Sequence, residues 1–233
     1  MTNMSTDNTY VDKRFDNIKH ADRKDNDRKK YRGLVLKNKM KILLISDSKT
    51  DISIAAMNVN IGYNKDPDDL PGLAHLCEHM LPLGTKECSQ QNDYNEYLSQ
   101  YGGYNNARTG LNSTNYYFNI IPKKLEGALD RFAQFFIAPL FRKDLIENEI
   151  NAIHSEYNEN STNDEWRLLA LVKLSVKSDH PFSKFSIGNK KTLDEIPKEK
   201  NIKVKDRLEH FYKKYYSANI MSLCILGKGR AII

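Results

Sequence analysis

Two histidines and a glutamate fall close together in the chain, at His75, Glu78 and His79. On a helix, residues four apart project from the same face about one turn apart, so both imidazoles point the same way. That spacing suits two nitrogen ligands of one tetrahedral zinc ion, and the glutamate is placed to take a proton from a water held by that metal. The alternative is a solvated helix face. Leu73 and Met80 flank the motif and favour a half-buried helix, where such polar groups need a partner.

A third protein ligand would complete the site while leaving one position for water. The segment 142–159 is predicted to be helical and carries several carboxylates. Glu149 and Glu156 are nearly two turns apart and therefore share a face, whereas His154 lies about 200° away from Glu156 around the helix. A solvated acidic helix explains the same spacing, so the residues alone leave the third ligand open.

The elements that would position these residues follow from the apolar pattern. Residues 1 to about 30 are polar and charged, which predicts a disordered or loose arm ahead of a domain at 31–233. Short apolar or alternating runs predict strands at 34–36, 42–45, 52–61, 104–109, 114–121 and 220–226. Helical spacing predicts helices at 91–101, 125–136, 142–159, 165–176 and 204–216, besides the motif helix. In the helix at 165–176, leucines and valine form a wide apolar face.

Composition narrows the class of protein. The chain has 233 residues, 39% of them hydrophobic, enough for one large domain or two small ones. Its formal net charge of +6 is spread among 30 acidic residues, which predicts no nucleic-acid partner. Three cysteines without regular spacing favour a reducing compartment. The sequence has no apolar run long enough for a transmembrane helix and no secretory signal, so we expect no membrane partner and a cytoplasmic location.

Several stretches together resemble the N-terminal catalytic domain of the insulinase (pitrilysin-type) family of zinc metallopeptidases. They are residues 72–80, 83–85, 114–118, 125–136, 149–156, 166–168 and 180–185. The resemblance runs from about residue 31 to 227. It implies an α+β domain with a mainly antiparallel sheet packed with helices, like that of mitochondrial processing peptidase and LuxS.

The resemblance also assigns roles by position. His75 and His79 match the family's zinc histidines, and Glu156 matches its third ligand, which implies one Zn²⁺ per chain. Glu78 matches the general base. Glu149 matches a second catalytic carboxylate that would orient or polarise the site. The order His-x-x-Glu-His is that of the inverzincin class.

A substrate strand is implied as well, because Asn106 and Ala107 match the family's edge strand, to which an extended peptide adds. Arg108 departs from the family, whose close members carry an aromatic residue there. The implied function is a zinc metalloendopeptidase acting on short, unstructured peptides.

The large members of the family have four such domains around a chamber. The domain at 31–233 is therefore expected to be truncated at its C-terminus and to need a C-terminal half or a homo-oligomer partner. The alternatives are a non-catalytic or regulatory module and an inactive fragment.

Overall fold

The frame of the molecule is a seven-stranded sheet in the order β1-β2-β3-β7-β4-β6-β5. The computed structural model describes residues 10–16, 18, 28–90 and 92–229. The strands are β1 (Val11–Asp16), β2 (Lys30–Leu36), β3 (Lys41–Ser46), β4 (Ser53–Val59), β5 (Tyr104–Thr109), β6 (Thr114–Ile120) and β7 (Met221–Gly227). Neighbouring strands pair antiparallel except β3 and β7, which are parallel. This confirms the expected α+β fold with a mainly antiparallel sheet.

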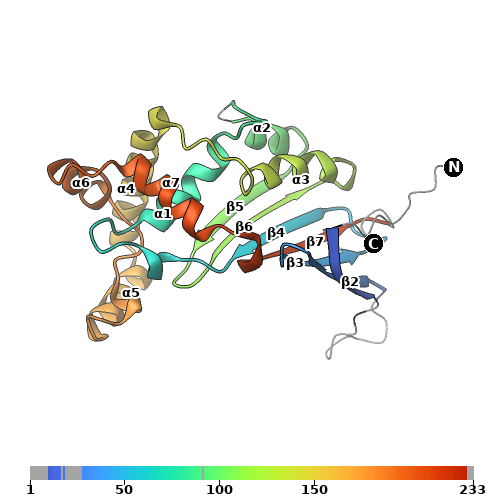
Figure 1. The fold of residues 1–233 in the computed structure, drawn as a ribbon, viewed down its shortest axis with the longest axis horizontal. Coiled ribbons are helices and arrows are strands. Elements are labelled where there is room, and N and C mark those ends of the chain that lie inside the picture. The colour runs from blue at the N-terminus through green and yellow to red at the C-terminus, as the bar shows by residue number, and fades with distance from the viewer. Residues whose placement is uncertain (1–9, 17, 19–27, 91, 230–233) are drawn as a thin grey trace.

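The helices gather on one side of this sheet and beyond its end (Figure 1). They are α1 (Leu73–Met80), α2 (Asp93–Gln100), α3 (Leu125–Gln134), α4 (Lys143–Ser161), α5 (Asp164–Ser175), α6 (Ile196–Glu199) and α7 (Val204–Tyr215), with a π-helical turn at Lys191–Glu195 before α6. Helix α1 contacts α4, α7 and the edge strand β5. The motif helix is therefore held between the sheet edge and the longest helix.

Alternating side chains explain which face of the sheet the helices cover. In β4 every second residue is buried, and Ala55, Met57 and Val59 point into the core. The same period in β6 buries Tyr116 and Phe118. Because successive strand residues point to opposite faces, the remaining positions leave a second, open face. The core therefore lies between one face of the sheet and helices α1, α2 and α3, which contribute buried residues to it.

The expected loose arm over residues 1–30 is corrected in part, because Val11–Asp16 forms strand β1 on β2. Residues 1–9, 17 and 19–27 lie outside the described part of the chain. The side chains of β1 are nearly all exposed, so the strand carries no apolar signature. Main-chain pairing holds it, together with ion pairs such as Arg32 to Asp16, 2.6 Å. An edge strand of this kind needs no buried face, which is why hydropathy missed it.

Two apolar segments are more exposed than their composition suggests. Helix α5 forms where expected, but none of its residues is buried. Strand β7 is predicted as a buried strand and lies near the middle of the sheet, yet five of its seven residues are only half-buried. None of the described helices combines the length and apolar character needed to cross a bilayer.

Candidate metal centre

Helix α1 places the two predicted histidines side by side. The Nε2 atoms of His75 and His79 are 3.3 Å apart, and their rings meet edge to face. The helix is fixed at its start by Asp66, a buried side chain whose two oxygens accept from the backbone N–H groups of Gly72 and Ala74, each at 2.8 Å. Those amides are donors that a helix start leaves without intrahelical partners. The histidine pair therefore rests on an anchored helix.

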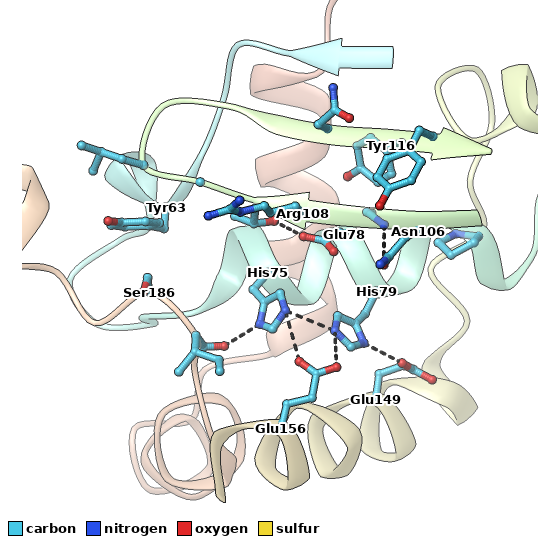
Figure 2. A pocket seen from close by; sticks show the side chains of 18 of the residues that line it. Tyr63, His75, Glu78, His79, Asn106, Arg108, Tyr116, Glu149, Glu156 and Ser186 are labelled. Carbon is cyan, nitrogen blue, oxygen red and sulfur yellow. Dashed lines mark hydrogen bonds and ion pairs between the residues drawn. The ribbon is translucent and has the colours of Figure 1, made fainter. Parts of the chain in front are cut away.

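Glu156 reaches the same point from α4. Its carboxylate oxygens lie 3.5 Å from Nε2 of His75 and 3.6 Å from Nε2 of His79. One ligand atom from each of these three residues lies within 4.8 Å of the others. Figure 2 shows both imidazoles and the carboxylate converging. The structure therefore gathers the three residues predicted to hold zinc.

The partners of the far ring nitrogens show that this group fits a cation. Nδ1 of His75 lies 2.7 Å from the carbonyl oxygen of Ile187, and Nδ1 of His79 lies 3.0 Å from Oε2 of Glu149. Both partners are acceptors, so each Nδ1 is the donor and each Nε2 presents a lone pair. Two lone pairs and a carboxylate facing one another repel unless a positive charge lies between them. Neutral imidazole and carboxylate ligands, with their outer nitrogens held, are those of a zinc site.

The pKa shifts of His79 and Glu156 express the same preference for positive charge, whereas that of His75 has the opposite sign. Burial lowers the pKa of His79, but its contacts with Glu149 and Glu156 outweigh burial and raise that pKa to about 9. Burial and the neighbouring His79 lower the pKa of His75. The hydrogen bond to His79 lowers the pKa of Glu156. The carboxylates thus favour a cation at the histidine pair, whether a proton or a metal.

Glu78 lies on the sheet side of this group. Its side chain accepts a hydrogen bond from the hydroxyl of Thr109 at the end of β5. Burial raises the pKa of the Glu78 carboxyl, although the Thr109 contact acts in the opposite direction. A carboxylate with a raised pKa is a better proton acceptor at neutral pH than an exposed one. Glu78 is therefore suited to proton transfer beside the three gathered side chains.

A cavity of about 1020 Å³ opens over the site. His75, Glu78, His79, Glu149 and Glu156 all line it. Residues 105–109 of β5 form another wall, so the predicted substrate residues Asn106 and Ala107 face this space. Among the described strands, β5 is an edge of the sheet and pairs with β6 alone.

Two other candidates from the sequence lie elsewhere. His154 stacks on Tyr157, and its buried Nδ1 has no hydrogen-bond partner among the described residues. Cys77 is buried in the core, and the three cysteines are free thiols.

Sequence reasoning missed Thr109 and the Ile187 carbonyl. Thr109 was within reach, because it is the last residue of the predicted edge strand, but a backbone carbonyl has no residue-type signal.

Comparisons with known proteins agree with this geometry. The sequence pattern of the family described as Insulinase (Peptidase family M16) matches residues 41–184. Insulin-degrading enzyme of Drosophila melanogaster is 55% identical over 202 residues, which is 87% of this chain and 20% of that protein. The A-factor-processing enzyme of Saccharomyces cerevisiae is 49% identical over 204 residues, 88% of this chain and 20% of that protein. A crystal structure of pitrilysin superposes with a TM-score of 0.86 at 35% identity, over 94% of this chain and 23% of that one. The chain spans about a fifth of the length of these curated relatives.

Proposed function

This chain belongs to the insulinase family, peptidase family M16, and from that premise we propose that it is a zinc-dependent metalloendopeptidase. His75, His79 and Glu156 would hold one Zn²⁺ per chain. The observation that carries the proposal is the convergence of these three side chains while both outer histidine nitrogens are engaged by acceptors.

The residues around the metal have separate tasks. When bound, zinc would supply Lewis-acid polarisation of a peptide carbonyl and make a water molecule more acidic. Glu78 accepts the proton of the attacking water and returns it to the leaving amine, for which its raised pKa suits it. Thr109 fixes the Glu78 carboxylate through its hydroxyl. Glu149 holds the ring of His79 in the orientation that directs Nε2 to the metal.

The substrate class follows from the edge strand. The amide nitrogen of Ala107, on the edge strand, donates to the side-chain oxygen of its neighbour Asn106, 2.8 Å away. A peptide in extended conformation would replace that contact and add to β5 as a further strand. Such pairing needs a free main chain, so we propose short, unstructured peptides as substrates.

Further parts of a longer protein would complete the enclosure of this site. The side chain of Glu156 is 45% exposed to solvent. Solvent weakens electrostatic interactions by raising the local dielectric. Because the relatives are much longer than this chain, we propose that a C-terminal half covers the cavity during turnover.

The test separates the metal from the base. Elemental analysis of the purified protein should give one zinc per chain, and His75→Ala or His79→Ala should lose it. Glu78→Gln should keep the zinc and lose about 10²- to 10⁴-fold of the peptidase rate, because an amide cannot accept the proton. Turnover is measured with a quenched fluorescent peptide, adding a C-terminal half from a longer relative. Full zinc content in both histidine variants would disprove the site, and parent-rate cleavage by Glu78→Gln would remove that residue from the reaction.

A further inference from the structure

Arg108 is a cation in the wall of the cavity whose side chain has no partner among the described residues. It lies on β5 between the proposed substrate residues and Thr109, and Figure 2 shows it in the same view as the zinc-binding side chains. Its side chain is exposed, and within the described part of the chain it makes no ion pair or hydrogen bond. The other lysine or arginine of the lining, Lys173, is engaged, because its amine donates to the Lys184 carbonyl and to Ser186 Oγ.

The acidic groups that line the cavity are not available to Arg108. Glu78 is bonded to Thr109, Glu149 is bonded to His79, and Glu156 lies against both histidines. On its own face of the sheet, Arg108 lies opposite Asn115 of β6. Asn115 in turn lies opposite Asn58 of β4, and Asn58 lies opposite Ser222 of β7. These three neighbours carry no charge, so none of them neutralises the guanidinium.

Strand addition would bring a substrate side chain to this cation. On one face of paired strands, directly opposite residues have Cβ atoms about 4.5–5.5 Å apart, and opposite charges there attract. A peptide whose main chain pairs at Ala107 places its next residue opposite Arg108, on the same face. We infer that Arg108 makes this site select a peptide with an acidic side chain, Asp or Glu, at that one position, an inference that rests on the proposed peptidase function.

The guanidinium suits this role by shape as well as charge. Arginine presents a planar fork of donors that matches a carboxylate in two parallel hydrogen bonds. Because the side chain is exposed, the gain is modest, and we expect about a fivefold preference for Glu over the isosteric Gln at that position. The preference should shrink as salt is raised from 0.05 M to about 0.5 M, since salt screens exposed charges.

The experiment compares one peptide series on four proteins. Quenched fluorescent peptides carry Glu, Gln or Lys at each position in turn near the cleaved bond, and kcat/KM is measured for the parent, Arg108→Gln, Arg108→Glu and Lys41→Gln. Lys41 is an exposed cation on β3, farther along the same row of strand positions and not among the cavity lining, so its variant removes equal charge away from the cavity. We expect the Glu-over-Gln preference at a single position in the parent and in Lys41→Gln. It should be lost in Arg108→Gln and replaced by a Lys preference in Arg108→Glu.

The experiment gives different results if the inferred role of Arg108 is wrong and if the proposed peptidase function is wrong. If the parent cleaves peptides but Glu, Gln and Lys are equivalent at every position, or if Arg108→Glu keeps the parent preference, the role of Arg108 is disproved and the peptidase stands. If no peptide is cleaved, the affinity of the same peptides for the zinc-loaded Glu78→Gln protein is measured by fluorescence anisotropy. Equal affinities for Glu and Gln peptides there would overturn the inference independently of turnover.

Discussion

At the scale of single residues, two glutamates on one helix have different relations to the same histidine. Glu156 faces the Nε2 atoms of both rings, whereas Glu149 contacts only Nδ1 of His79, on the far side of that ring. The distinction follows from the seven-residue spacing, which puts both on one face of α4 about 10.5 Å apart along the axis. One carboxylate is therefore placed to bind the metal and the other to orient a ligand.

Replacing Glu149 should weaken zinc binding without abolishing it. In Glu149→Gln the amide oxygen still accepts from Nδ1, but the negative charge that makes His79 more basic is gone. We expect zinc affinity to fall about 10- to 100-fold, as for other groups behind a ligand. Competition with a chromophoric chelator measures the affinity. Glu147→Gln, an exposed change on the same helix, is the control and should bind zinc like the parent. Equal affinity in Glu149→Gln would exclude the orienting role.

The sequence predicted this site through side chains whose chemistry is specific. The spacing of His75, Glu78 and His79 was informative by itself, while the third ligand needed the family resemblance to separate Glu156 from Glu149 on the same helix face. The Ile187 carbonyl that holds His75 was beyond prediction, because any residue supplies that acceptor. The unpaired state of Arg108 likewise depends on where every neighbouring carboxylate points.

At the scale of elements, a contact between two glycines joins the motif helix to the segment that holds it. Gly72 precedes α1 with φ of +93°, and a Cβ built there would lie 2.4 Å from Cα of Gly188. This close approach places the neighbouring Ile187 carbonyl against His75. A side chain at either glycine would push the two segments apart.

Gly72→Ala should therefore lower both stability and zinc affinity. The left-handed conformation alone costs about 1–2 kcal/mol for a non-glycine residue, and the clash adds to that cost. The matched control is Gly102→Ala, since Gly102 has φ of +65° but nothing within 4 Å of a built Cβ. Denaturant unfolding and chelator competition are measured on both. Gly102→Ala should lose stability only, and a normal zinc affinity in Gly72→Ala would contradict the proposed coupling.

The buried carboxyl at the start of α1 should make stability depend on pH. Burial raises the pKa of Asp66 to about 7, against the effect of its backbone hydrogen bonds. Its unfolded value is near 3.8, so the native state holds the extra proton between these values. The contribution of Asp66 to the free energy of unfolding therefore falls as pH rises from about 4 to about 7. Asp66→Asn does not titrate, so unfolding of the zinc-saturated proteins at pH 5 and pH 8 should differ less in the variant. An equal change in unfolding free energy between pH 5 and pH 8 in the parent and in Asp66→Asn would show that Asp66 is not the source of the pH dependence.

Element prediction succeeded where a helix or strand has one buried face and failed where it does not. Strands β4 and β6 were evident from their alternation, which one packed face imposes. Strand β1 has no such face and was hidden in a polar segment. Helix α5 was found by its apolar residues, but its lack of burial depends on what surrounds it, which local sequence does not encode.

At the scale of the whole molecule, α5 presents an uncovered apolar stripe. Leu168, Leu171 and Leu174 are 63%, 64% and 82% exposed and follow one another at intervals of three residues. Residues three apart are neighbours on a helix surface, so these side chains form one patch. Trp166 and Leu169 of the same helix line the cavity, which brings the patch close to the proposed active site.

Such a patch should drive self-association of the 233-residue chain, because contiguous exposed apolar surface favours association in water. We expect sedimentation velocity to show an average mass that rises with protein concentration, and the double variant Leu171→Lys with Leu174→Lys to abolish that rise. Gln100→Lys, an exposed change on α2, adds charge away from the leucine stripe and should associate like the parent. Association stabilises the folded chain by mass action, so the melting temperature should rise with concentration in the parent and in the control but not in the double variant. A parent chain that stays monomeric throughout, or a double variant that associates equally, would show that this stripe does not drive association.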